Sequence, residues 1–320
     1  MQIMRLIFMI AMGTMASALL TSTEIPVLQH KQFKQFIREE GPQSHLAKEG
    51  TPTMGGISIF GALLIVTLMG SGFRLDSLVM LGVGFLFGLI GFADDFIKVS
   101  KKHNLGLRAW QKLCLQIVFG VLLGYYMAKF SGHGTQVWIP FIDQNIDFGS
   151  LYIPFIAFVV VAMANCVNLT DGLDGLSSGV TALVAIFFGI VALQLKHGEA
   201  MIFCGALAGA CLGFLIFNRF PAKLFMGDTG SMLLGGALAA AAIVMKVEFL
   251  LPIAGFIYVL EGLSVIIQVV CFKLTGKRVF KMAPIHHHFE VGGMKEQRVV
   301  VMFWGITLVC CIIAYVVFII

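Results

Sequence analysis

The chain has 320 residues, of which 58% are hydrophobic and only 12% are charged, and its mean hydropathy is +0.94. A typical soluble domain carries about 25% charged residues, so this chain lacks the charge that covers a water-soluble globule. The composition excludes an ordinary soluble enzyme, a disordered chain and a secreted disulfide scaffold. It predicts a polytopic membrane protein. The seven cysteines show no paired spacing, so we interpret them as small packing residues.

Ten apolar runs approach the length of about 20 residues that a helix needs to cross a bilayer. The first continues past a weak candidate cleavage site near residue 18, so we expect an uncleaved helix there. In the ninth, Pro252, Gly255 and Gly262 permit a bend. We therefore expect one transmembrane domain over residues 1–320, all-α, with about ten helices. The runs fall at residues 3–23, 54–70, 77–93, 110–129, 151–167, 176–195, 200–217, 230–246, 249–272 and 299–319.

The positive charges fall mainly on one side of this ten-helix arrangement. The odd-numbered loops and their flanks hold 17 of the 22 lysines and arginines, and the other side holds 5. Because short loops rich in Lys and Arg stay in the cytoplasm, we expect the odd-numbered loops to be cytoplasmic and both termini to be extracytoplasmic. The loop at residues 130–150 then lies outside and is a candidate for a short hairpin.

Acidic residues are costly near lipid, so their positions are informative. On this topology, polar residues from four separate loops meet at the cytoplasmic face. Carboxylates near lysines suit a Mg²⁺-dependent phosphoryl-transfer site, since Mg²⁺ is held by one or two carboxylates plus substrate phosphates and lysines neutralise the remaining charge. The residues that converge are Asp94, Asp95, Asn168, Asp171, Asp174, Asn218, Asp228, His286, His287 and His288, with Lys48, Lys98, Lys102 and Lys112 on the same face.

Each of these features also has a purely structural interpretation. Asp94 and Asp95 suit a hydrated helix end, and the segment Asn168–Gly175 suits an ordinary turn that caps the next helix. Phe225 suits either interfacial packing or stacking on a base. Glu261, inside the ninth run, suits a protonated or paired acid that packs helices.

Five segments resemble, in order along the chain, the phospho-N-acetylmuramoyl-pentapeptide transferases, a family of the polyprenyl-phosphate N-acetylhexosamine-1-phosphate transferase superfamily. The last segment, Pro-Ile-His-His-His-Phe-Glu, favours the muramoyl-pentapeptide branch over the N-acetylglucosamine branch. The segments are Thr51–Gly56, Asp94–Lys98, Asn165–Leu176, Phe217–Ser231 and Pro284–Glu290.

This resemblance implies a multi-pass enzyme of the bacterial plasma membrane that requires Mg²⁺ and forms a homodimer. It would transfer phospho-N-acetylmuramoyl-pentapeptide from its UDP form to undecaprenyl phosphate. The products would be UMP and lipid I, which remains in the inner leaflet for peptidoglycan synthesis. Its partners would be these two substrates and membrane lipid, with no nucleic acid.

The resemblance also implies roles for individual residues. Asp228 is the expected metal ligand, and Asp94 and Asp95 are expected to position or activate the lipid phosphate. Phe225 is expected to stack on uracil, and Glu261 to border a groove for the prenyl chain. Because the second pKa of a phosphate is about 6, the lipid phosphate is already ionised at neutral pH, which favours direct attack over a covalent intermediate. The expected substrate-binding residues are Lys48, Lys98, Lys102, Lys112, Asn165, Asn168, Asp171, Asp174, Asn218, Phe225, His286, His287 and His288.

Three other functions compete with this interpretation. A sister enzyme that transfers N-acetylglucosamine-1-phosphate would share the topology and the aspartates, and the ninth loop argues against it. An ion-coupled transporter would place its charges near the bilayer midplane, whereas here they collect at one face. A scaffold without activity gives no reason for this convergence.

Overall fold

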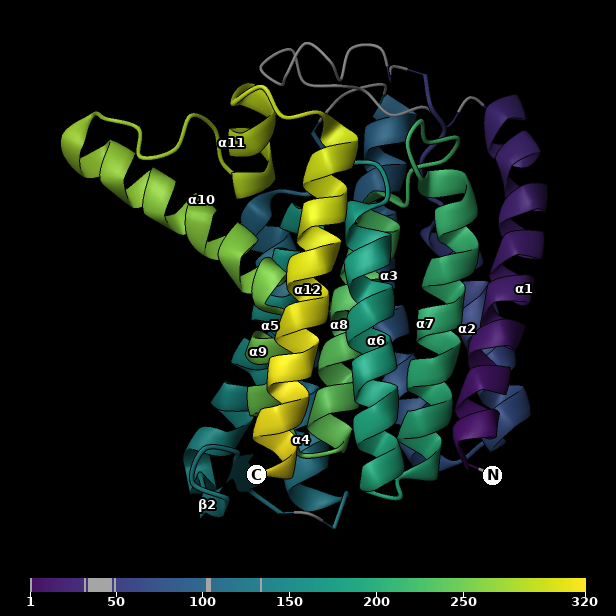
Figure 1. The fold of residues 1–320 in the computed structure, drawn as a ribbon, viewed down its shortest axis with the longest axis vertical. Coiled ribbons are helices and arrows are strands. Elements are labelled where there is room, and N and C mark those ends of the chain that lie inside the picture. Colours follow the sequence, from purple (N-terminus) through teal and green to yellow (C-terminus); the bar gives the residue numbers. More distant parts are fainter. Residues whose placement is uncertain (1, 32, 34–47, 49, 102–104, 133) are drawn as a thin grey trace.

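The computed structural model describes residues 2–31, 33, 48, 50–101, 105–132 and 134–320, which form a bundle of helices with one small hairpin (Figure 1). The long helices are α1 (Gln2–His30), α2 (Gly56–Ser71), α3 (Leu75–Lys101), α4 (Ala109–Lys129), α5 (Tyr152–Thr170), α6 (Leu176–Gln194), α7 (Gly198–Asn218), α8 (Gly227–Val244), α10 (Phe256–Thr275) and α12 (Glu296–Ile319). The short elements are η2 (Gly149–Leu151), η3 (Glu248–Leu250), α9 (Leu251–Ala254), α11 (Ile285–Val291), β1 (Gln136–Ile139) and β2 (Gln144–Asp147).

Nine of the ten apolar runs predicted from the sequence each form one helix, and the ninth run is divided among η3, α9 and α10. Within the described ranges, nine helices are long and apolar enough to cross a membrane, and α2 is a shorter apolar helix of 16 residues. A bilayer offers no water to backbone N–H and C=O groups, so each spanning segment must satisfy them internally. The prediction of a helical polytopic membrane protein is confirmed.

Two predicted boundaries are wrong in ways that change where polar residues lie, and a third run is interrupted where the sequence permits a bend. Helix α3 continues past Asp94 and Asp95, which therefore lie inside its last turns. Helix α8 begins at Gly227, so Asp228 is in its first turn and not in the preceding loop. The ninth run is interrupted at Gly255, which separates α9 from α10, and α10 leans away from the bundle (Figure 1). Polar residues end an apolar run, but they need not end a helix.

The hairpin expected at residues 130–150 is present. Strands β1 and β2 pair antiparallel, with Gln136 opposite Asp147 and Ile139 opposite Gln144. The hairpin lies at the same end of the bundle as the start of α1 and the end of α12, and α11 lies at the opposite end (Figure 1). Both ends of the chain thus share one side, and the assignment of that side to the exterior stays a prediction.

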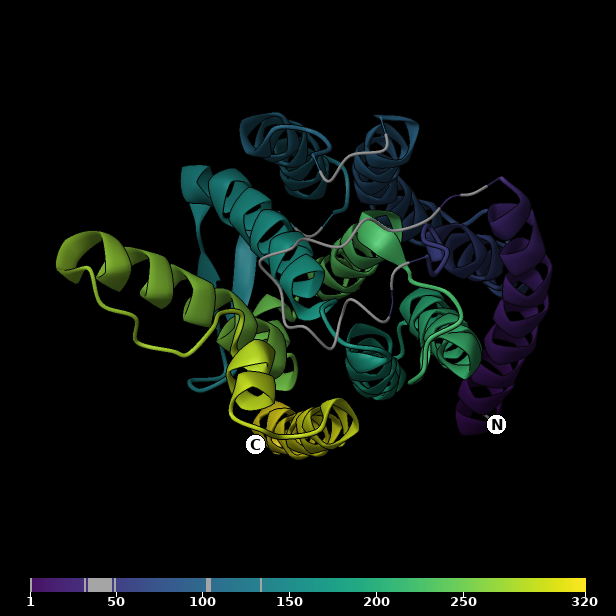
Figure 2. The same cartoon turned by 90° about the horizontal axis from the view of Figure 1, so that it is seen from above.

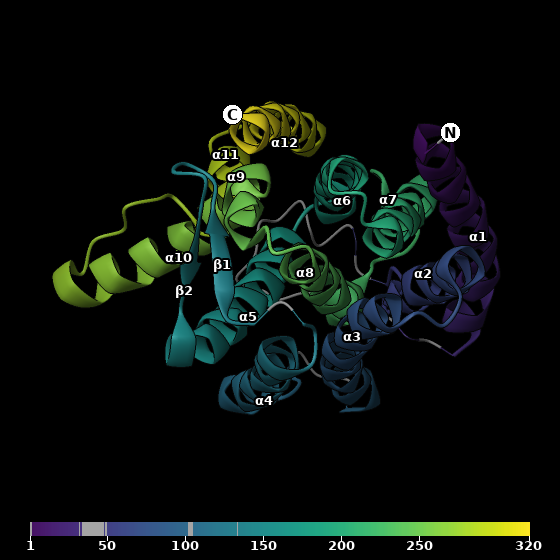
Figure 3. The ribbon, with the colours of Figure 1, turned by 90° about the horizontal axis from the view of Figure 1, so that it is seen from below.

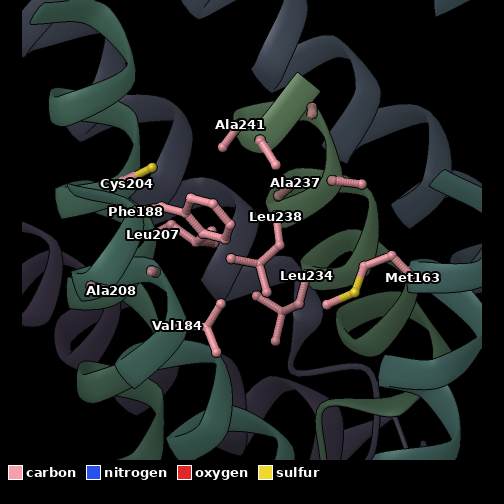
Figure 4. Packing of buried hydrophobic residues seen from close by; sticks show 14 of the residues in the cluster. Met163, Val184, Phe188, Cys204, Leu207, Ala208, Leu234, Ala237, Leu238 and Ala241 are labelled. Atoms are coloured by element: carbon pink, nitrogen blue, oxygen red, sulfur yellow. The ribbon is translucent and has the colours of Figure 1, made fainter. Parts of the chain in front are cut away.

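Helix α8 forms the centre of the bundle. Helices α2, α3, α5 and α6 pack around it (Figures 2 and 3), and all of its residues from Thr229 to Val244 are buried. Its larger side chains, Leu234 and Leu238, face Val184 and Phe188 of α6 (Figure 4). Glycines and alanines fill most other positions of α8, which lets neighbouring helices approach closely, as is common where helices associate in lipid.

The closest approaches to α8 occur around its first turn. A Cβ atom added to Gly91 of α3 would lie 2.0 Å from the carbonyl oxygen of Asp228. One added to Gly56 of α2 would lie 2.3 Å from the backbone nitrogen of Gly230. Backbones of α2 and α3 therefore touch the start of α8 directly, and they fix the position of Asp228.

We expect Gly91→Ala to lower the stability of the folded protein by about 1–3 kcal/mol, because the added methyl group forces α3 away from α8. Gly82→Ala is a matched control on the same helix, since a Cβ atom there meets no atom within 4 Å. Thermal unfolding of both variants in detergent measures the difference. Equal midpoints for the two variants would contradict the close packing described for Gly91.

Candidate active site

Three aspartates and two lysines meet at the end of the bundle where α3 ends and α8 begins. One carboxylate oxygen from each of Asp94, Asp95 and Asp228 can be chosen so that all lie within 4.8 Å of one another. The Lys98 ammonium lies 2.6 Å from Oδ2 of Asp94 and 3.0 Å from Oδ2 of Asp228. The Lys112 ammonium, from α4, lies 2.6 Å from the same Asp228 oxygen. The two cations offset the repulsion among the carboxylates. We call these five residues the acidic cluster.

Asp95 holds the start of α8. Its carboxylate accepts hydrogen bonds from the backbone N–H of Asp228 at 3.2 Å, and from the backbone N–H and hydroxyl of Thr229 at 2.9 and 2.7 Å. The first N–H groups of a helix have no partner within the helix and carry partial positive charge, so a buried carboxylate is well placed there. Gly227 precedes them with φ of +69°, a conformation that glycine adopts without strain.

Asp228 is the most open of the three carboxylates. Its side chain is 18% exposed, against 1% for Asp94 and 5% for Asp95. Oδ1 of Asp228 accepts a 2.8 Å hydrogen bond from the Asn168 amide, and Oδ1 of Asp94 accepts one of 2.7 Å from the N–H of Leu107. The Oδ2 atoms of Asp94 and Asp228 both contact the ammonium groups of Lys98 and Lys112. Such hard oxygen donors fit a cation like Mg²⁺.

The loop between α5 and α6, residues 171–175, carries two further carboxylates of the site, Asp171 and Asp174. Burial raises the pKa of Asp171 well above its usual range, and the negative charges of Asp228 and Asp95 raise it further. The carboxylate of Asp174, in contrast, has a cation and an N–H group as partners. Its Oδ1 lies 2.7 Å from the Lys48 ammonium, and its Oδ2 accepts a 2.9 Å hydrogen bond from Ala222.

Glu296, which the sequence analysis missed, completes this second group of charges. Its Oε1 lies 2.5 Å from the Lys48 ammonium and accepts a 2.8 Å hydrogen bond from the backbone N–H of Asp174. It is the first residue of α12. No sequence signal marked it, because an acid at the start of a helix is common for its interaction with the helix dipole.

Three further predicted site residues make local contacts. The Asn218 side chain accepts from the N–H of Gly175 and donates to the carbonyl of Leu224, so it ties two loops together. Asn165 donates to the Gln116 side chain at 2.7 Å and so links α5 to α4. The backbone of Phe225 forms hydrogen bonds with the segment before α2, and the residue as a whole is half-buried. Lys102 lies outside the described residues.

The three consecutive histidines have separate partners. His286 lies against Gly172 of the α5–α6 loop, and its Nδ1 is 3.0 Å from Oε1 of Glu261. His287 pairs with Glu290 at 2.8 Å. Nδ1 of His288 accepts a 3.1 Å hydrogen bond from the N–H of Lys281. Glu261 is fully buried, which agrees with the paired-acid interpretation of this residue. Its proposed role beside a prenyl groove stays a prediction.

We expect Asp171→Asn to stabilise the substrate-free protein more at pH 8 than at pH 5. A carboxyl group whose pKa is raised by folding holds its proton more tightly in the folded chain, so folding is penalised increasingly as the pH rises above about 4. Asparagine does not ionise and removes this penalty. Thermal unfolding in detergent with EDTA measures the effect, and an equal gain at both pH values would show that the Asp171 pKa is not raised.

Comparison with known proteins assigns the chain to a family. Residues 77–246 match the glycosyl transferase family 4 model, and residues 48–60 match signature 1 of the phospho-N-acetylmuramoyl-pentapeptide-transferases. A phospho-N-acetylmuramoyl-pentapeptide-transferase of Thermoanaerobacter pseudethanolicus is 51% identical over 91% of this chain and 92% of its own length. That of Clostridium perfringens (strain 13) is 47% identical over 97% and 98%. The chain therefore belongs to the phospho-N-acetylmuramoyl-pentapeptide-transferase family, as a multi-pass protein of the bacterial inner membrane.

Proposed function

We propose that the chain transfers phospho-N-acetylmuramoyl-pentapeptide from its UDP form to undecaprenyl phosphate, releasing UMP and lipid I. The names of its relatives support phospho-N-acetylmuramoyl-pentapeptide as the group that is transferred. The observation that carries the proposal is the acidic cluster, in which Asp228 is the least buried of three carboxylates and lies between two lysines. Its place at one end of the membrane helices suits a reaction between a lipid phosphate and a water-soluble donor. We propose that this end faces the cytoplasm.

The substrates bring several negative charges into this site. Lys98 and Lys112 both contact Oδ2 of Asp228 in the absence of substrate. A bound diphosphate competes for these ammonium groups, and their transfer to phosphate oxygens frees Asp228. Asp228, with Oδ2 of Asp94 beside it, would then hold Mg²⁺, which neutralises charge on the diphosphate. Asp95 keeps its hydrogen bonds to α8 and maintains the position of Asp228 throughout.

The reaction needs positioning more than base catalysis. A lipid phosphate is ionised at neutral pH, so its oxygen attacks directly the donor phosphorus that carries the sugar. A new P–O bond joins the two phosphates, the bond from this phosphorus to the oxygen of UMP breaks, and UMP leaves on the opposite side. Asp94 lies beside Lys98 and Lys112, which in this proposal bind the lipid phosphate and the donor diphosphate. We assign Asp94 to placing the attacking lipid phosphate. Electrostatic stabilisation by the two lysines supplies the remaining contribution of the chain.

The second group of charges fits the nucleoside end of the donor. Phe225 stacks on the uracil ring in this proposal, and Lys48 and Asp174 bind its polar edge or the ribose. In the free protein Lys48 is held between Asp174 and Glu296, which orders its long side chain before substrate arrives. We further propose a homodimer, as the resemblance to the family implies.

A transfer assay in detergent tests the proposal and the role of Asp228 together. With undecaprenyl phosphate, we expect UMP release and labelled lipid from UDP-N-acetylmuramoyl-pentapeptide, only with Mg²⁺, and none from UDP-N-acetylglucosamine. Asp228→Asn should lower the rate by about 100-fold or more. Asp76→Asn, in the first turn of α3 at the other end of that helix, is the control and should retain activity. Transfer from the N-acetylglucosamine donor instead would assign the chain to the sister reaction.

We expect Phe225→Ala to raise the KM for the UDP donor by about tenfold, because stacking of a base on an aromatic ring contributes about 1–3 kcal/mol. The KM for undecaprenyl phosphate should not change. Phe225→Tyr keeps the ring and should restore donor affinity. Steady-state kinetics with each substrate varied in turn measures both constants, and an unchanged donor KM in the alanine variant would remove Phe225 from the nucleoside pocket.

A further inference from the structure

A carboxylate and an imidazole form a fully buried pair beside the active site. Oε1 of Glu261, on α10, lies 3.0 Å from Nδ1 of His286, on α11, and their side chains are 0% and 1% exposed. Removing such groups from water is costly unless each finds a partner. The pair joins α10 to α11, which are separated in the sequence by the loop at residues 276–284. It therefore anchors α11 to the membrane helices.

The other ring nitrogen of His286 points to the active-site loop. Nε2 has no hydrogen-bond partner among the described residues. It lies against Gly172, where an added Cβ atom would come within 2.2 Å of it. Gly172 follows Asp171 and precedes Asp174, the two carboxylates of this loop. Buried polar atoms in proteins are nearly always hydrogen-bonded, so an unpartnered nitrogen at the edge of a site indicates a bond that forms only with a ligand.

The bond to Glu261 decides which hydrogen bonds Nε2 makes. A neutral imidazole carries its proton on one nitrogen and accepts with the other, and the partner of the first selects this tautomer. A carboxylate only accepts. With Glu261 as a carboxylate and His286 as a neutral imidazole, the proton lies on Nδ1 and the Nε2 lone pair is directed toward Gly172. The same arrangement orients histidines in metal sites, where a carboxylate behind the ring sets its direction.

We propose that Glu261 is a positioning residue that makes Nε2 of His286 a hydrogen-bond acceptor for a hydroxyl or N–H group of the bound substrates. The identity of those substrates rests on the proposed function, whereas the tautomer does not. Substrate binding moves the Gly172 backbone off the ring and gives Nε2 its partner. Without Glu261 the ring turns or takes the other tautomer. An N–H of the ring then faces the hydroxyl or N–H of the substrate, and no hydrogen bond forms between two donors.

Nitrogen-15 NMR of the histidine-labelled protein in detergent, without substrate, tests the tautomer. We expect the wild-type protein to show a protonated Nδ1 and an unprotonated Nε2 for His286, with the signals assigned by their loss in His286→Asn. In Glu261→Gln the amide oxygen still accepts from Nδ1–H, so this spectrum should persist. A protonated Nε2 in the wild-type protein would overturn the proposal.

Transfer kinetics test the positioning role. We expect Glu261→Leu to lower kcat by about tenfold or more, with a smaller change in the donor KM, and Glu261→Gln to restore most of the rate. Glu248→Gln is the control, because Glu248 is also buried, at 2% exposure, but lies in η3 beyond the far end of α8. Equal loss of activity in Glu261→Gln and Glu261→Leu, with both proteins folded, would also overturn it. If the wild-type protein transfers no phospho-sugar, the proposed function fails while the NMR result still decides the tautomer.

Discussion

The contact between Asp95 and the first turn of α8 is the interaction on which the rest of the site depends. Three hydrogen bonds from Asp228 and Thr229 end on this one carboxylate, and Gly91 brings α3 against the same turn. A charged group is tolerated there because the helix terminus supplies N–H donors and a favourable dipole. The central helix is thereby fixed with Asp228 facing the lysines of α3 and α4, and no flexible loop is needed to place it.

The remaining ties join the α5–α6 loop to distant parts of the chain. Glu296 and Lys48 hold Asp174, and His286 supports Gly172 from the other side. Each tie connects the loop to a different helix or segment. Such a site is held in place before substrate binds, so binding energy is not spent on ordering long side chains. Burial raises the pKa of Asp171, and the neighbouring carboxylates of Asp228 and Asp95 raise it further.

Much of the architecture followed from the apolar pattern because a bilayer allows few alternatives. Nine of the ten runs became one helix each, and the ninth is divided near Gly255, among the residues that permit a bend. The convergence of Asp94, Asp95 and Asp228 also followed, since charge is excluded from the lipid region and polar residues must collect at its edges. Helix ends were less predictable, because α3 and α8 continue beyond their apolar runs. There the carboxylates of Asp95 and Asp228 pair with N–H groups and lysines.

The sequence by itself determined the class of protein, the positions of the apolar runs and the polar residues that gather at one end of the bundle, because hydropathy and local motifs are properties of neighbouring residues. Only the tertiary structure decided which partners those residues have. It separated Asp95, which binds the start of α8, from Asp228, which pairs with Lys98 and Lys112. It also joined Glu296 to Lys48 and Glu261 to His286. These pairs are separated by 248 and 25 residues, and nothing in the local sequence records which buried charges will meet once the helices pack.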